Sequence, residues 1–158
     1  QLAEDEFNKL RLSRTFNSGM STLRQVHFAL TDLKLHSEWD KSLGITPDEL
    51  RRQIATSSTV LQPIKEDQFL CSFSHIFAGG YSAGYYSYKW AEVLSADAFS
   101  AFEEVGLEKT PLVKETGKRF RETVLSMGGS RPPQEIFKKF RGRSPSTKAL
   151  IRHSGLTA

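Results

Sequence analysis

The chain has very little cysteine and no long hydrophobic run. Its only cysteine is Cys71, so no disulfide can form within the chain, and a reducing compartment fits this composition. No apolar stretch approaches the roughly 18 residues of a membrane span, and the acidic N-terminus has no feature of a signal or transit peptide. We therefore expect a soluble protein without a membrane partner, in the cytoplasm, with an organelle such as the mitochondrion as the alternative.

The chain also lacks a strong charge of either sign. Its 158 residues include 22 Lys and Arg and 18 Asp and Glu, which give a net charge of +4 at pH 7. This excess is modest for a nucleic-acid binder, which normally concentrates basic side chains on one face. The clearest basic cluster, Lys138–Arg143, is either a solvated helix end or an anion-binding patch. We expect no nucleic-acid partner.

Strand alternation, internal repeats and low-complexity tracts are absent, whereas helical periodicity dominates. The segment Thr46-Pro47-Asp48-Glu49 has the Thr, the first-turn Pro and the Glu of a helix capping box. We predict an all-α fold and a single helical region over residues 1–158. The expected helices lie near residues 4–16, 19–39, 47–57, 83–104, 114–127 and 133–140, with a short one near 145–153.

The connection over residues 62–84 has little periodicity and is rich in Ser, Phe and Gly. Loops of this length are usually functional or disordered, and this one is too aromatic for plain disorder. All four tyrosines of the chain fall within residues 81–88. If a helix begins near Ala83, Tyr85 and Tyr88 lie three residues apart on one helix face.

Clustered tyrosines can serve catalysis or simply pack. A tyrosine hydroxyl is neutral at pH 7 and can donate a hydrogen bond to a carbonyl oxygen that gains negative charge during attack. A histidine before a glycine hinge, as His75 is, could add a second donor. The alternative is that the tyrosines pack with their hydroxyls at the surface, and spacing alone favours this plainer interpretation.

Residues 75–99, HIFAGGYSAGYYSYKWAEVLSADAF, closely resemble the C-terminal region of the thimet oligopeptidase family of zinc metallopeptidases. The branch with oligopeptidase A and dipeptidyl carboxypeptidase is nearest. The resemblance continues in residues 23–30, LRQVHFAL, and 137–145, FKKFRGRSP, so it spans most of the chain. It implies a mostly helical zinc enzyme that hydrolyses short peptides in a channel between two halves.

The resemblance also implies roles for single residues. Tyr88 would be the catalytic donor to the oxyanion, and His75 would be a second catalytic contact. Tyr85 and Tyr81 would bind substrate, the latter from a mobile loop. The glycines of this substrate loop region match the family's hinge and are Gly79, Gly80 and Gly84.

The zinc motif of that family, H-E-x-x-H with a further Glu, is absent from these residues. The histidines of the chain are His27, His36, His75 and His153. None is followed by Glu or by a second His four residues later, and His27 and His36 are about half a turn out of phase on a helix. We expect no metal site in this chain. The zinc of a parent enzyme would be bound by residues before Gln1, so this piece alone would be inactive.

Other interpretations stay open. An uncovered apolar face of the 19–39 helix could favour self-association. Cys71 lies four residues before His75, but closeness in sequence does not make a thiolate–imidazole pair. Glu103-Glu104 are most simply solvated acids rather than general acids. The alternative of a different class is a non-catalytic helical interaction module that binds peptides or acidic partners, which would not need the tyrosine–glycine segment.

Overall fold

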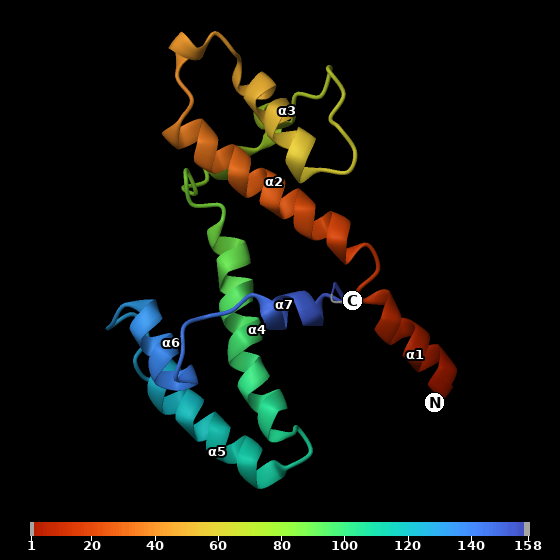
Figure 1. Ribbon diagram of the computed structural model, residues 1–158, viewed down its shortest axis with the longest axis vertical. Coiled ribbons are helices and arrows are strands. Elements are labelled where there is room, and N and C mark those ends of the chain that lie inside the picture. The colour runs from red at the N-terminus through yellow and green to blue at the C-terminus, as the bar shows by residue number, and fades with distance from the viewer. Residues whose placement is uncertain (1, 157–158) are drawn as a thin grey trace. The chain divides into compact units, whose positions relative to one another are not determined.

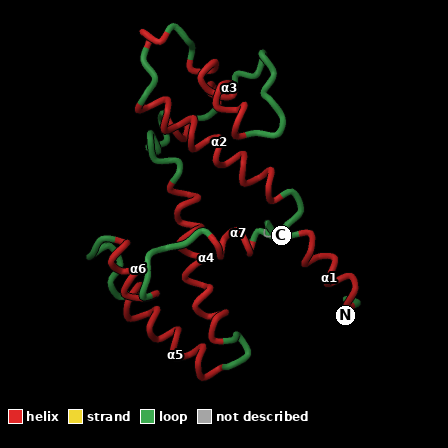
Figure 2. Tube along the Cα trace, viewed as in Figure 1, coloured by secondary structure: helices red, strands yellow, loops and turns green. Residues whose placement is uncertain are grey.

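Every regular element of the chain is helical within residues 2–156, which are the residues that the computed structural model describes (Figures 1 and 2). The all-α prediction is confirmed. The chain divides into two compact units, Gln1–Lys89 and Trp90–Ala158, and each is described by itself. The single helical region over 1–158 therefore stays a prediction, and its end residues 1, 157 and 158 lie outside the described part.

The first unit contains the first three α-helices of the chain. Their bounds are α1 (Glu4–Ser13), α2 (Ser18–Ser37) and α3 (Pro47–Ser58). The three predicted helices are confirmed, with ends that differ by up to three residues. The first helix ends early because the chain turns before Asn17, whose φ of 55° is a left-handed conformation that Asn tolerates. Helices α2 and α3 pack side by side (Figure 1).

The start of α3 is fixed by the predicted capping box. The Glu49 amide donates to Thr46 Oγ1 at 3.2 Å, and the Thr46 amide donates to Glu49 Oε2 at 2.7 Å. Further along the helix, the buried Arg51 donates to the Asp67 carboxylate at 3.1 Å and to the Asp67 carbonyl at 2.9 Å. These bonds tie α3 to the start of the 62–84 connection.

The 62–84 connection supplies core residues to the first unit. It contains two 3-10 turns, Phe69–Ser72 and Ser74–Ile76. Leu70, Phe73 and Ile76 are buried here together with Leu35 of α2. Leu70 and Ile76 each belong to one of the two turns, and Phe73 lies between the turns. The connection is therefore packed rather than a free loop.

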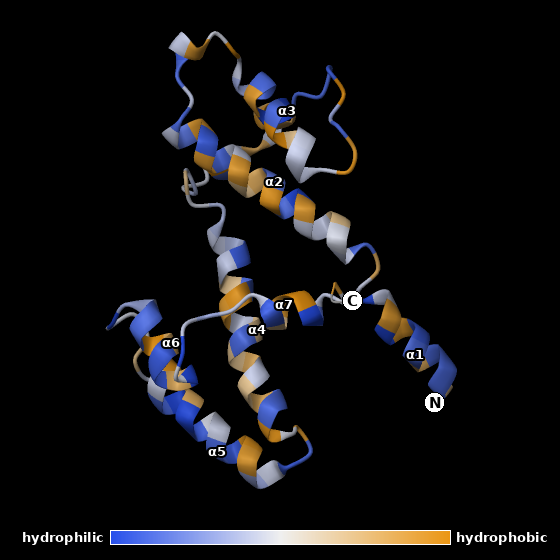
Figure 3. Ribbon diagram, viewed as in Figure 1, coloured by the Kyte–Doolittle hydropathy of each residue, from blue (hydrophilic) through white to orange (hydrophobic). Residues whose placement is uncertain are grey.

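Apolar side chains remain exposed at the N-terminal end of this unit. None of the described residues of α1 is buried, and Figure 3 shows that hydrophobic residues occur along this helix. The larger ones on α1, in the turn after it and at the start of α2 are 38% to 78% exposed. They are Phe7, Leu10, Leu12, Phe16, Met20 and Leu23. Self-association through such a face stays a prediction.

The second unit contains most of α4 and the remaining helices. Their bounds are α4 (Ser87–Val105), α5 (Thr110–Phe120), α6 (Pro133–Arg141) and α7 (Lys148–His153). Helix α5 begins four residues earlier than the predicted start at residue 114, and a π-helical turn, Arg121–Leu125, extends its C-terminal end. No helix within residues 2–156 combines the length and apolar character needed to cross a membrane.

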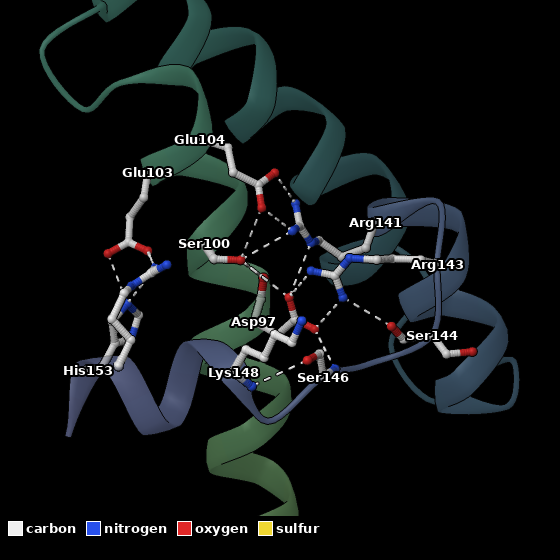
Figure 4. A network of polar contacts seen from close by, with 11 residues as sticks. Asp97, Ser100, Glu103, Glu104, Arg141, Arg143, Ser144, Ser146, Lys148 and His153 are labelled. Atoms are coloured by element: carbon white, nitrogen blue, oxygen red, sulfur yellow. Dashed lines mark hydrogen bonds and ion pairs between the residues drawn. The ribbon is translucent and has the colours of Figure 1, made fainter. Parts of the chain in front are cut away.

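An ionic network joins the chain segments of the second unit around Asp97 of α4 (Figure 4). Asp97 is 1% exposed and accepts two hydrogen bonds from Arg143, at 2.7 and 2.5 Å, and one from the Ser146 amide at 2.7 Å. Arg141 lies 3.5 Å from the same carboxylate and also binds Glu104 at 2.5 and 3.0 Å. Two residues of the basic cluster are thus internal ion-pair partners.

The two adjacent acids of α4 both have ion-pair partners; the Glu104 side chain is also solvated at 59% exposure, whereas that of Glu103 is 29% exposed. Glu104 binds Arg141, as described above, and Glu103 binds Arg152 and accepts a hydrogen bond from His153 at 2.9 Å. These partners lie about 40 to 50 residues further along the chain, so the acids hold α6 and α7 to α4.

Candidate substrate-binding site

The tyrosine segment is held by a buried carboxylate of α2. Asp32 accepts hydrogen bonds from the amides of Ala83 and Tyr85, both at 2.9 Å. Ala83 adopts a φ of 56°, which a helix does not allow, so α4 begins at Ser87. The predicted helix start near residue 83 is therefore wrong, and Tyr85 precedes the helix instead of sharing a helix face with Tyr88.

The structure nevertheless brings the predicted site residues of the first unit together. The Tyr88 ring stacks on Tyr81, with centroids 5.2 Å apart, and meets the edge of Tyr85 at 5.1 Å. His75 lies 5.9 Å from the Tyr85 ring and 6.2 Å from the Tyr81 ring. We call these four side chains the tyrosine cluster. Tyr81, Tyr88 and His75 are exposed, which leaves them accessible to a ligand.

Aromatic packing and a hydrogen bond to α2 orient Tyr85. Its ring contacts Phe73 at 5.1 Å and Phe28 at 6.0 Å, both edge-on. Its hydroxyl donates to Gln25 Oε1 at 3.0 Å. Asp32 and Gln25 were missed by the sequence interpretation. A signal for Asp32 exists, because it falls at helical spacing between Phe28 and Leu35, on the apolar face of α2.

Two of the three predicted hinge glycines are required by the local backbone. The Gly79 amide donates to the Ser74 carbonyl at 2.8 Å, and a Cβ at residue 79 would lie 2.8 Å from the His75 Cα. Gly80 has a φ of 79°, a conformation that favours glycine. At Gly84 a Cβ would make only ordinary contacts, the nearest at 3.4 Å from the Tyr81 carbonyl oxygen. The hinge role of all three stays a prediction.

Substitution of Gly79 by Ala is expected to distort the loop that carries His75. The added Cβ would overlap backbone atoms that cannot move independently, at a cost of about 1–3 kcal/mol, typical of overpacking. Urea unfolding and the backbone amide shifts of residues 74–81 measure this effect. Gly129→Ala is the matched control, because no atom lies within 4 Å of its Cβ position. Equal stabilities of the two variants would contradict the steric argument.

The environment keeps the central phenols protonated. Burial raises the pKa of Tyr85, and the positive charge of Arg24 only partly offsets this effect. A hydrogen bond with Tyr81 is the main cause that raises the pKa of Tyr88, followed by burial. Because an unperturbed phenol already titrates near 10, both hydroxyls stay neutral at pH 7 and can act as hydrogen-bond donors.

The described side chains do not form a zinc site. Within residues 2–156, no group of three or more His, Cys, Asp or Glu side chains could hold a metal ion. Two histidines of α2 have other partners. His27 Nδ1 lies 2.9 Å from Ser58 Oγ, and burial lowers the pKa of its imidazole. His36 Nδ1 lies 2.9 Å from the Asp32 carboxylate.

Comparison with known proteins identifies the class of this chain. The sequence model of peptidase family M3 matches residues 1–156. The chain therefore belongs to peptidase family M3, a family that is generally zinc-dependent, and the predicted resemblance to the thimet oligopeptidase family is confirmed.

Similar proteins include oligopeptidases A and a dipeptidyl carboxypeptidase. The chain is 54% identical over 157 residues to the probable cytosolic oligopeptidase A of Arabidopsis thaliana. This match covers 99% of this chain and 22% of that protein. It is 53% identical to the organellar oligopeptidase A, chloroplastic/mitochondrial, of the same plant, covering 99% and 20%. The dipeptidyl carboxypeptidase of Escherichia coli is 33% identical, covering 94% and 21%. The chain thus spans about a fifth of the length of these relatives.

Proposed function

We propose that this chain is the substrate-binding part of a zinc-dependent oligopeptidase that hydrolyses short peptides. The observation that carries the proposal is the tyrosine cluster, in which the exposed rings of Tyr81 and Tyr88, the partly buried ring of Tyr85 and an imidazole lie within one small area of the first unit. Membership of peptidase family M3 supports a peptide as the ligand.

In this proposal each side chain of the tyrosine cluster has its own role in substrate binding or catalysis. Tyr88 donates to the carbonyl oxygen of the scissile bond, because its hydroxyl is protonated and its ring is half exposed. His75 is the second contact to that oxygen. Tyr85 and Tyr81 bind the peptide on either side of Tyr88. The zinc belongs to residues of the parent enzyme that are not among these 158.

The proposal also covers location, substrates and partners. The names of the two Arabidopsis proteins support a cytoplasmic location, with an organelle as the alternative. Short peptides are the substrates, and we assign neither a nucleic acid nor a membrane as a partner. Self-association would use the apolar face of the 19–39 helix, on which Met20 and Leu23 are exposed.

The purified 158-residue chain is expected to bind no stoichiometric zinc and to cleave no peptide, because its described side chains include no metal-binding group. Metal analysis and a quenched-fluorescence peptide assay with added zinc measure both properties. The parent protein, expressed from a reading frame that encodes H-E-x-x-H and a following Glu upstream of Gln1, is the positive control. Zinc-dependent cleavage by the rigorously purified chain would contradict the proposal.

Peptide binding separates the proposal from the alternative, a non-catalytic helical interaction module. A short peptide added to the chain should shift the ring signals of Tyr81, Tyr85 and Tyr88, with little dependence on salt. An acidic partner bound by the basic cluster would instead dissociate steeply as salt rises. The ion pairs of Arg141 and Arg143 already favour the first outcome.

A further inference from the structure

Asp32 is the one side chain of α2 that contacts the backbone of the tyrosine segment through two hydrogen bonds. It is fully buried, at 0% exposure. Its Oδ1 accepts from the Ala83 amide and its Oδ2 from the Tyr85 amide, across 51 and 53 residues of sequence. His36 adds a third contact, with Nδ1 at 2.9 Å from Oδ1.

A buried carboxylate is costly unless its oxygens are paired, so its position in the apolar face of α2 needs a reason. The pairing explains the conformation of the segment. Two amides separated by one residue point at the same carboxylate only if the backbone between them curls, as it does at Ala83 with its left-handed φ of 56°. The carboxylate thus stabilises a turn that alanine would not adopt by preference.

This turn determines where the phenols lie. The Tyr85 amide is fixed on Asp32, and its side chain reaches Gln25 and the aromatic core. The Tyr88 amide donates to the Tyr85 carbonyl at 3.3 Å, immediately where α4 begins. The position of Tyr88 therefore depends on the position of Tyr85.

We propose that Asp32 is a positioning residue, which sets the geometry of Tyr85 and Tyr88 for substrate through the Ala83–Tyr85 turn. The inference rests on the proposed function of the cluster, but the geometric part can be tested without any substrate. All four tyrosines of the chain lie in residues 81–88, so every tyrosine signal reports on this segment alone.

The test compares the wild-type chain with Asp32→Asn. An Asn side chain offers one acceptor oxygen, and its NH₂ group would face a backbone N–H, so at most one of the two hydrogen bonds survives. Tyrosine ring signals followed by NMR against pH give the phenol titrations. We expect the pKa values of Tyr85 and Tyr88 to fall toward the ordinary value, with altered ring shifts, while the helical signals of α3 persist.

Asp40→Asn is the matched control, because Asp40 also accepts a backbone amide, from Ser42 at 2.7 Å, and is exposed and distant in sequence from the tyrosines. Its tyrosine titrations should equal those of the wild type. Unchanged titrations in Asp32→Asn would overturn the inference.

Amide hydrogen exchange of the wild-type chain tests the inference even if the Asp32→Asn variant does not fold. The amides of Ala83 and Tyr85 should exchange with solvent at least 10-fold more slowly than free amides, because both donate to a buried acceptor. Exchange at the unprotected rate would overturn the inference. Peptide titration of the same samples tests the proposed function separately. If the wild-type chain has these protected amides but binds no peptide, the proposed function is contradicted and the positioning role of Asp32 still holds.

Discussion

Tyr88→Phe in an oligopeptidase-length parent enzyme is expected to lower the turnover number about 100- to 1000-fold, the usual effect of removing one oxyanion donor. The reason is that the substitution removes only the hydroxyl, whereas the ring keeps its stacking on Tyr81 and its edge contact with Tyr85. In the proposed role the hydroxyl would act on charge that develops during attack, so turnover should fall far more than the Michaelis constant rises. Steady-state kinetics on a short fluorogenic peptide measure both.

Tyr86→Phe provides the control for this experiment. Tyr86 is exposed, lies in the same segment and has no assigned role, so its loss of a hydroxyl should change turnover by less than about 3-fold, as expected for surface substitutions. Circular dichroism should give the same helix content for both variants. A Tyr88→Phe enzyme that turns over within a few-fold of the wild type would exclude Tyr88 as the oxyanion donor.

Local sequence patterns were sufficient for most of the fold. The capping box at Thr46–Glu49 fixed the start of α3 because all of its hydrogen bonds lie within four residues. The start of α4 could not be found in this way. It depends on hydrogen bonds from Ala83 and Tyr85 to Asp32, more than 50 residues away, and helical propensity alone continues the helix back to residue 83.

The structure brings Tyr81, Tyr85, Tyr88 and His75 together, but the sequence did not indicate what supports them. Spacing alone favoured simple packing of the tyrosines, and the site roles came from the family resemblance and stay predictions. The support from Asp32 could not be predicted from spacing alone, because spacing places it on an apolar helix face without naming the amides that it binds.

The basic cluster shows a further limit of reading charge from sequence. Lys138–Arg143 looked like a solvated helix end or an anion patch. In the structure the Arg143 guanidinium binds Asp97, 46 residues earlier, and Arg141 binds Glu104, 37 residues earlier. A run of basic residues forms a free charged surface only when no acidic residue from elsewhere in the chain pairs with it in the folded structure. The residues next to the run do not show whether such a partner exists.

The same network makes Asp97 the residue whose substitution should destabilise the second unit most. Asp97→Asn keeps the size of the side chain but removes its charge, which leaves Arg143 and Arg141 without their shared carboxylate. We expect a loss of about 3 kcal/mol in the free energy of unfolding, the lower end of the range for breaking a buried ion pair, because the Arg143 side chain is 44% exposed. Urea unfolding followed by the amide signals of α6 and α7 measures it.

The pH dependence of stability tests the cause of that loss. Burial opposes the ionisation of Asp97, but hydrogen bonds from Arg143 and the Ser146 amide and the charges of both arginines outweigh it, so the pKa of Asp97 is lowered in the folded chain. A lowered folded pKa means that the stabilisation is complete above the unfolded pKa, near 4, and is lost as pH falls through the folded value. The wild-type unit should therefore lose stability below about pH 4, whereas Asp97→Asn should lose less over the same range. Asp5→Asn, which removes an exposed pair with Lys9, should behave as the wild type does. Parallel pH profiles for Asp97→Asn and the wild type would show that packing, rather than the ion pairs of Asp97, holds α6 and α7 against α4.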